Sequence, residues 1–323
     1  MNKVVLLADP KSNAWDFAEK IENYLSQEKK VNVPLEPIEI GRFDNGEIDM
    51  HVPKNIREKD VYFIHDSTQD PQDWLVEILL ANNLFLLASA SEINYVLPDI
   101  KYNRQDRKHK PRVPISATIL PDFLKHYWPK VKRVFTMDLH SPQIVGYYAP
   151  IPIEALPSSP MLVEFLRKKS GIPNLEEIVV VAADRGDANR AEDLSNLLNS
   201  INPPAYIYKQ RDTETRKVTR MDLVGNVKGK RVLVPDDIID KGTTLCKARE
   251  LLFEKGAAEI ICYATHGLFT KGTEVITNCF NRTMVSNTHN KDYGDKIEVI
   301  DMSPRFAEAI YRAQTGESVS ELY

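Results

Sequence analysis

Short apolar runs alternate with segments of helical periodicity along the chain. Runs such as Val4–Ala8 and Val61–Ile64 are typical of buried strands, whereas the spacing of apolar residues in 14–25 predicts a helix. A long apolar segment at 74–90 predicts a helix that is buried on most sides. The other predicted strands are 35–40, 93–97, 131–136, 178–182, 205–208, 232–234, 260–265 and 297–302, and the other predicted helices are 116–127, 161–169, 191–198, 245–254 and 304–313.

This alternation of strands and helices predicts an α/β fold with largely parallel sheets. Four prolines between residues 149 and 160 interrupt it, and we place a domain boundary after residue 157. The second half then repeats the strand and helix order of the first. We therefore expect two similar open α/β domains, 1–157 and 158–303, with ligand-binding loops at the carboxyl ends of their strands.

Composition narrows the class of protein. The chain has 323 residues and a net charge of −4, so we expect a globular, soluble protein without nucleic-acid partners. The three cysteines are odd in number and lack metal-like spacing, which favours a reducing compartment and argues against a disulfide framework. No apolar stretch is long enough to span a membrane, and the run after Met1 is too short for a signal sequence. We expect a cytoplasmic location.

The stretch 231–244 carries the strongest candidate chemistry. An apolar run leads to Asp236 and Asp237, and Asp240 then precedes Lys-Gly-Thr-Thr and a helical pattern. Gly242 allows a tight turn, and the N–H groups of the following helix suit an anion. The two adjacent carboxylates can accept hydrogen bonds from sugar hydroxyls or help to hold a metal. This indicates a ribose-phosphate pocket; the alternative is a strand with a polar cap before a helix.

Two earlier loops also offer binding groups. Asp44-Asn45-Gly46 is turn chemistry and predicts a hairpin tip, although Phe43, Asn45 and Glu47 could together hold a nucleobase. The stretch 101–112 has six Lys or Arg residues and one acid. It is either a solvated loop or a mobile basic flap that closes over a polyphosphate.

Further polar groups follow other predicted strands. Asp138 and His140 lie two residues apart at a strand end, where side chains two apart point the same way, and can form a metal or phosphate corner. The loop 183–190 leads into a helix, and 209–216 is polar and expected to be mobile.

Taken together, these stretches closely resemble the ribose-phosphate diphosphokinase (phosphoribosyl diphosphate synthetase) family, and the similarity covers essentially the whole chain. The matching motifs are residues 43–47, 102–108, 114–116, 136–140, 236–240, 264–267 and 316–320. Their order and spacing are together very specific. The resemblance implies two domains of the type I phosphoribosyltransferase kind, with 304–323 packing back onto the first.

The resemblance also implies the reaction: ATP and ribose 5-phosphate give phosphoribosyl diphosphate and AMP, with Mg²⁺. The implied ATP-binding residues are Phe43, Asn45, Glu47, Arg104, Gln105 and His140. The implied metal ligands are His140, Asp184 and Asp138, and the implied catalytic residues are Lys209 and Arg211. The implied ribose 5-phosphate site is Asp236, Asp237, Asp240, Lys241, Gly242, Thr243 and Thr244. The family is usually a homo-oligomer, often hexameric, with its ATP site shared between subunits.

Several positions depart from the family pattern. Asp187 stands where a second glycine is usual and brings a negative charge near the phosphates. Gln210 removes the middle charge of the usual Lys-Arg-Arg, while Lys241 and Thr243 replace the usual Thr and Gly of the phosphate loop. We expect Lys241 to attract the ribose 5-phosphate, although it could also block the site.

Pro142 and Val145 replace two residues that help bind regulatory phosphate or ADP in the common class. We therefore expect phosphate activation to be weak or absent.

Two alternatives to the synthetase function remain. A phosphoribosyltransferase would share the phosphate loop but would not need the loops 43–47 and 104–112. A non-catalytic partner subunit of the same fold would explain the departures.

Overall fold

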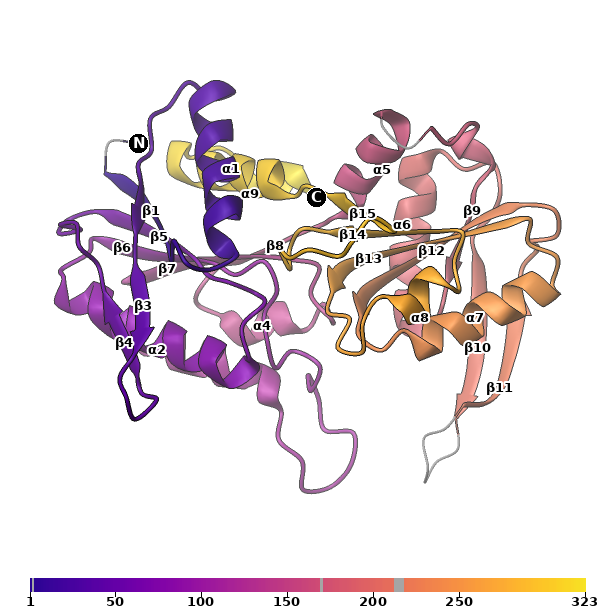
Figure 1. Cartoon of the computed structure of the whole chain (residues 1–323), viewed down its shortest axis with the longest axis horizontal. Coiled ribbons are helices and arrows are strands. Elements are labelled where there is room, and N and C mark those ends of the chain that lie inside the picture. Colours follow the sequence, from indigo (N-terminus) through magenta and orange to yellow (C-terminus); the bar gives the residue numbers. More distant parts are fainter. Residues whose placement is uncertain (2, 169–170, 212–217) are drawn as a thin grey trace. The chain divides into compact units, whose positions relative to one another are not determined.

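The computed structural model describes residues 1, 3–168, 171–211 and 218–323, which divide into two compact units (Figure 1). Unit 1 comprises Met1–Pro157, Asn287–Lys291 and Met302–Tyr323. Unit 2 comprises Ser158–Ser286 and Asp292–Asp301. Among the described residues, none of the helices is both long enough and apolar enough to cross a membrane.

Unit 1 is built on a parallel sheet in the order β2-β1-β5-β6-β7-β8. Its strands are β1 (Val4–Ala8), β2 (Leu35–Pro37), β5 (Asp60–Ile64), β6 (Glu92–Val96), β7 (Val131–Met137) and β8 (Ile153–Leu156). Its helices are α1 (Ala14–Gln27), α2 (Pro71–Leu87), α3 (Ile119–Lys125), α4 (Ile144–Tyr148) and α9 (Ser303–Thr315), with 3-10 turns at Ser116–Thr118 and Val319–Leu322. A separate hairpin pairs β3 (Glu39–Arg42) with β4 (Ile48–His51).

Alternation along the strands explains the layers of unit 1. Val5 and Phe63 point into the core formed with α2, while Leu6 on the same strand as Val5 lies on the opposite face. Figure 1 shows α1 and α9 side by side on that opposite face, where Phe17 and Phe306 pack edge to face at 5.5 Å between ring centroids.

Unit 2 is a seven-stranded sheet in the order β11-β10-β9-β12-β13-β14-β15. Its strands are β9 (Val179–Ala182), β10 (Ala205–Arg211), β11 (Val218–Val224), β12 (Arg231–Ile239), β13 (Glu259–Gly267), β14 (Arg282–Ser286) and β15 (Ile297–Ile300). Its helices are α5 (Ser159–Lys168), α6 (Ala188–Leu198), α7 (Thr243–Glu254) and α8 (Glu274–Thr277), with 3-10 turns at Leu175–Glu177 and Arg185–Asp187. The pairing is parallel except for β10 with β11. Helices α5 and α6 cover one face and α7 and α8 the other (Figure 1). The predicted α/β fold with largely parallel sheets is confirmed.

Two strands continue into polar residues that the sequence pattern assigns to loops. β12 continues to Ile239, so Asp236 and Asp237 lie within a strand rather than in the loop expected after 232–234. Parallel pairing with β13 up to Gly267 explains this, because ladder hydrogen bonds hold polar residues in the strand. In the same way β10 extends through Arg211 because it pairs with β11, a strand that the sequence pattern did not predict.

Three other expectations in unit 1 are wrong. The predicted strand 35–40 is two strands in different sheets, because Leu35–Pro37 pairs with β1 whereas Glu39–Arg42 pairs with β4 in the hairpin. The proline-rich stretch 149–160 contains β8. Helix α2 buries Trp74 and its neighbours on one side. Val76 and Leu87 are 43% and 77% exposed, because the helix covers one face of the sheet and the described residues leave its outer side uncovered.

The expectation about cysteines is also wrong. A disulfide joins Cys246 on α7 to Cys279 just after α8, with 5.8 Å between their Cα atoms. Cys262, on β13, is a free and buried thiol. The two bonded residues are 33 positions apart, so no local pattern in the chain pairs them.

Candidate functional site

The loop between β12 and α7 forms a tight turn at Gly242. This residue is the N-cap of α7 with φ 74°, a left-handed conformation that favours glycine. A Cβ atom there would lie 2.5 Å from the side chain of Ile276, so the position also lacks room for a side chain. Lys241, Thr243 and Thr244 are exposed around it. The loop therefore presents a cation, two hydroxyls and the N–H groups that begin a helix, the donor set that binds a phosphate.

A second loop supports the first. The hydroxyl of Thr270 donates a hydrogen bond to Oδ1 of Asp240. The backbone N–H groups of Leu268 and Phe269 donate to the Ile239 carbonyl at 2.8 and 3.2 Å. The segment after β13 therefore holds the end of β12 in place beside the predicted phosphate loop.

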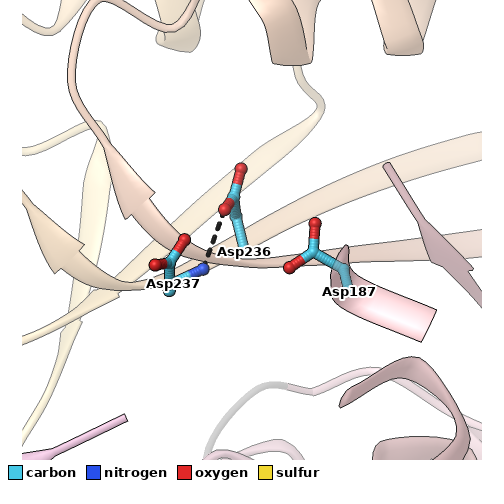
Figure 2. A group of neighbouring side chains, drawn as sticks. All are labelled: Asp187, Asp236 and Asp237. Carbon is cyan, nitrogen blue, oxygen red and sulfur yellow. Dashed lines mark hydrogen bonds between the residues drawn. The ribbon is translucent and has the colours of Figure 1, made fainter. Parts of the chain in front are cut away.

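Three carboxylates gather at the end of β9 and on β12. Figure 2 shows Asp236 and Asp237 on the strand, with Asp187 facing them from the short helix that follows β9. Each offers a ligand atom within 4.8 Å of the other two. The backbone N–H of Asp237 donates to Oδ1 of Asp236 at 2.8 Å. Because β9 and β12 are adjacent in the sheet, the polar residues that follow or end these strands meet at one edge.

The charges of this carboxylate cluster oppose one another. Burial, reinforced by the charge of nearby Asp184, raises the pKa of Asp187 to about 7. Burial and the Asp187 charge likewise raise the pKa of Asp236 well above its ordinary value. Nε of Arg190 lies 3.9 Å from Oδ1 of Asp187 and lowers that pKa in part. The cluster is therefore most stable when a proton or a bound cation neutralises it.

Oxygen ligands from several carboxylates are what Mg²⁺ and Ca²⁺ prefer in proteins, so Asp187, Asp236 and Asp237 fit a hard divalent cation. The sequence offers Asp236 and Asp237 as groups that help to hold a metal, and it indicates that the unfavourable charge of Asp187 needs a metal or Arg185 to compensate it, but it does not predict that the three carboxylates meet. The structure adds Asp187 to the set. Its position directly after a strand that neighbours β12 was the available signal, but the strand order is not written in the sequence.

The metal ligands predicted from the sequence, His140, Asp184 and Asp138, are not the residues of this carboxylate cluster. Asp184 caps the short helix Arg185–Asp187, and its Oδ1 accepts a hydrogen bond from the Gly186 N–H at 2.8 Å. Asp138 and His140 lie in unit 1, after β7 has ended at Met137. Asp138 has φ 38°, so the expectation that the pair points one way by strand alternation is wrong. The set draws on both units and stays a prediction.

The residues predicted to hold adenine lie on the tip of the β3–β4 hairpin. The Phe43 N–H donates to the Glu47 carbonyl at 2.9 Å, and the Asn45 side-chain oxygen accepts from the Glu47 N–H at 3.1 Å. The Phe43 ring is 55% exposed and the Glu47 side chain is exposed too. The turn thus fixes the backbone while leaving an aromatic ring and a carboxylate available for a ligand.

The basic stretch 101–112 is irregular, as expected for a loop. Arg104 is exposed and Gln105 half-buried. The base of the loop is anchored, because buried Asp106 accepts a hydrogen bond from Gln143 and the Gln105 carbonyl accepts one from the Ala117 N–H. The rest of the basic loop, after residue 106, therefore extends from an anchored starting point.

Lys209 and Arg211, predicted as catalytic residues of a mobile loop, lie in strand β10 instead, since β10 pairs with β11. Lys209 is opposite Met221 in this pairing and is half-buried. The rest of the expected loop, 212–216, lies outside the described residues.

Comparison with known proteins matches most of the chain. A family model described as the N-terminal domain of ribose phosphate pyrophosphokinase matches residues 10–127, and one described as the phosphoribosyl synthetase-associated domain matches residues 200–323. The ribose-phosphate pyrophosphokinase of Aquifex aeolicus is 37% identical over 328 residues, which cover 100% of both chains. Ribose-phosphate pyrophosphokinase 4 of Saccharomyces cerevisiae is 36% identical, over 100% of this chain and 95% of its own.

The fold is similar to a solved structure over nearly the whole chain. The crystal structure of phosphoribosylpyrophosphate synthetase from Mycobacterium smegmatis superposes with a TM-score of 0.83 and 28% sequence identity. The superposition covers 97% of this chain and 99% of that one.

Proposed function

Because the chain belongs to the ribose-phosphate pyrophosphokinase family, we propose that it transfers the diphosphoryl group of ATP to the 1-hydroxyl of ribose 5-phosphate, giving phosphoribosyl diphosphate and AMP. The observation that carries this proposal is the full-length identity to ribose-phosphate pyrophosphokinases. The phosphate loop at Gly242 and the neighbouring carboxylates support it independently, since they are the groups that a ribose phosphate requires.

We assign the ribose 5-phosphate to unit 2. Asp236 and Asp237 accept hydrogen bonds from the ribose hydroxyls. Residues 240–244 surround the 5-phosphate, with N–H donors at the start of α7 and the Lys241 ammonium as counter-charge. This arrangement leaves the 1-hydroxyl as the nucleophile.

We assign ATP to loops that carry exposed polar and aromatic groups. Phe43, Asn45 and Glu47 hold adenine, and Arg104 and Gln105 contact the nucleotide, with Arg104 on its phosphates. Phosphoryl transfer needs positioning and charge neutralisation more than covalent help from the protein. Lys209 and Arg211 are the cations proposed to stabilise the charge that develops on the transferred group.

His140, Asp184 and Asp138 are proposed to hold Mg²⁺ with ATP. When bound, magnesium would supply positive charge that neutralises the phosphates. The carboxylate cluster of Asp187, Asp236 and Asp237 offers a second donor set of suitable chemistry. Within the cluster, either a proton or a bound cation can neutralise Asp187, because its pKa lies near 7.

The resemblance also leads us to propose that the chain works in the cytoplasm as a homo-oligomer, often a hexamer in this family, whose ATP sites are shared between subunits. Val76, Leu80 and Leu87 are exposed and recur four and seven residues apart along α2, so they lie along one side of the helix and support self-association. We further propose that the two compact units are its two domains. Sedimentation at several protein concentrations measures the oligomer.

The test is a coupled assay for AMP with Mg-ATP, with and without ribose 5-phosphate and without added phosphate. We expect AMP only when the sugar is present. Because Pro142 and Val145 replace residues of the usual regulatory site, the rate should change less than about twofold when phosphate is added. Activity that appears only with phosphate would refute the regulatory inference. Silence under both conditions would refute the proposed reaction.

A further inference from the structure

The disulfide lies directly beside the predicted phosphate loop. Cys246 is in the first turn of α7, and its N–H donates to the Gly242 carbonyl at 3.0 Å, the first hydrogen bond of this helix. Cys279 follows α8, and its N–H donates to the Ile276 carbonyl at 2.9 Å. The Ile276 side chain fills the space above Gly242. The contacts therefore form a closed ring that runs from Gly242 through both cysteines and Ile276 back to Gly242.

We propose that Cys246 and Cys279 form a reversible disulfide that sets the rigidity of the loop 240–244 and, resting on the proposed function, the affinity for ribose 5-phosphate. In the oxidised chain the bond holds α8 against the loop. In the reduced chain the ring is open at the sulfurs, and Ile276 is held above Gly242 only by packing and by the weak hydrogen bond that the Cys246 thiol can donate to the Val275 carbonyl. A loop that is already ordered loses less conformational entropy when it binds its ligand, so the oxidised chain binds more tightly.

The sulfur environment is compatible with both redox states. Cys246 is 8% exposed, and its Sγ lies 3.4 Å from the Val275 carbonyl oxygen, an acceptor that the reduced thiol can use. Cys279 is more accessible than Cys246. Cys262 is fully buried in β13 and remains a free thiol, so it takes no part in the exchange.

The oxidant is a small-molecule disulfide such as glutathione disulfide. The Cys279 thiolate attacks one of its sulfurs and releases one glutathione thiolate, which leaves a mixed disulfide. The Cys246 thiolate then attacks the Cys279 sulfur and releases the second glutathione. Two protein thiols are oxidised to one disulfide, and one glutathione disulfide is reduced to two thiols.

The experiment equilibrates the full chain in oxidised or reduced glutathione buffers. Alkylation under denaturing conditions followed by mass spectrometry should find one free thiol in the oxidised chain and three in the reduced chain. Hydrogen exchange of peptides covering residues 240–246 should be about three- to tenfold slower in the oxidised chain. Calorimetry should give a Kd for ribose 5-phosphate about three- to tenfold lower in the oxidised chain.

Matched variants separate the outcomes. Cys262→Ala retains the pair and should respond like the wild type, whereas Cys246→Ser and Cys279→Ser should exchange equally in both buffers. Failure of the disulfide to form in any glutathione buffer, or equal exchange in wild-type oxidised and reduced chains, overturns the proposal. Altered exchange with equal affinity in the two states overturns its link to ligand binding. Altered exchange without ribose 5-phosphate binding in either state supports redox control of the loop and instead refutes the proposed function.

Discussion

Acidic side chains follow the strands of both units, but their surroundings differ. In unit 1 the Asp66 carboxylate after β5 accepts hydrogen bonds from the N–H groups of Asn13 and Thr68 at 3.1 and 2.7 Å. Buried Glu77 on α2 has its Oε2 3.0 Å from Nε2 of His65. Asp66 is therefore satisfied by donors of its own unit, and Glu77 has the His65 ring beside it.

In unit 2 the buried acids instead face one another, with Asp187, Asp236 and Asp237 inside a 4.8 Å group. Burial and mutual repulsion raise the pKa of Asp187 and of Asp236. Similar parallel sheets therefore place Asp66 and Glu77 beside donors and a histidine ring in unit 1, whereas in unit 2 they bring three acids together in a cluster that favours a cation or a hydroxyl-rich ligand. The difference teaches that strand-end acids indicate a binding site when they lie close to one another and burial raises their pKa, because a bound cation then stabilises them.

The largest expected effect is on catalysis. Asp237→Asn should lower the rate of ribose 5-phosphate-dependent AMP release about 100- to 1000-fold, or about 3–4 kcal/mol, because the ribose loses a charged acceptor. Thermal stability should not fall, since one of three opposed charges is removed. Asp222→Asn, on the edge strand β11, is the matched control and should stay within about twofold. A rate above a tenth of wild type for Asp237→Asn would contradict this role.

A change in the unit 1 cluster should affect stability instead. Glu77→Ala leaves buried His65 without its partner and opens a cavity, so the free energy of unfolding should fall by about 2–4 kcal/mol. Urea unfolding measures it. Glu19→Ala removes an exposed acid from α1 and should change stability by less than about 0.5 kcal/mol. Equal effects of the two substitutions would show that the buried pair of His65 and Glu77 contributes nothing to the free energy of unfolding.

The pH dependence of stability provides a further test of the unit 2 carboxylate cluster. The folded pKa of Asp187, about 7, lies above its ordinary value of 3.8, so the folded state binds more protons in this window. Stability from this group is therefore present at low pH and falls as pH rises from about 4 to 7. Asp187→Asn should stabilise the fold more at pH 8 than at pH 5, and the difference in the free energy of unfolding should be about 1–2 kcal/mol. Melting temperatures at the two pH values measure it.

Magnesium ions provide the control for this substitution. At pH 8 they should raise the melting temperature of the wild type more than that of Asp187→Asn, because the variant loses a carboxylate ligand. A variant that is destabilised equally at pH 5 and pH 8 would show that Asp187 serves packing rather than charge.

The smallest effect is expected at the exposed phosphate loop. Lys241→Thr should weaken ribose 5-phosphate binding about three- to tenfold, because an exposed ammonium contributes only about 1 kcal/mol through solvent. Lys255→Thr, at the opposite end of α7, should leave the Kd unchanged. Calorimetry at low and high salt tests the electrostatic origin, and unchanged or tighter binding by Lys241→Thr would show that this lysine blocks the site.

Local periodicity was sufficient for the fold class and for many elements. The strand Val4–Ala8 was predicted with its observed bounds, and α1 and β5 to within two residues. These elements bury one apolar face or run, so neighbouring residues alone carry the signal. The prediction failed for β10 and for the end of β12, where polar residues are held in strands by partners elsewhere in the chain.

The sequence by itself determined which family the chain resembles, the α/β order of its elements, and the loop 240–244 with its turn at Gly242, since these depend on residues close together in the chain. Only the tertiary structure decided that Asp187 joins Asp236 and Asp237, and that Cys246 meets Cys279. Both depend on which strands become neighbours in the sheet and on how the helices pack against it. The packing of apolar surface throughout the unit determines such non-local pairing, and the local periodicity of the sequence does not specify it.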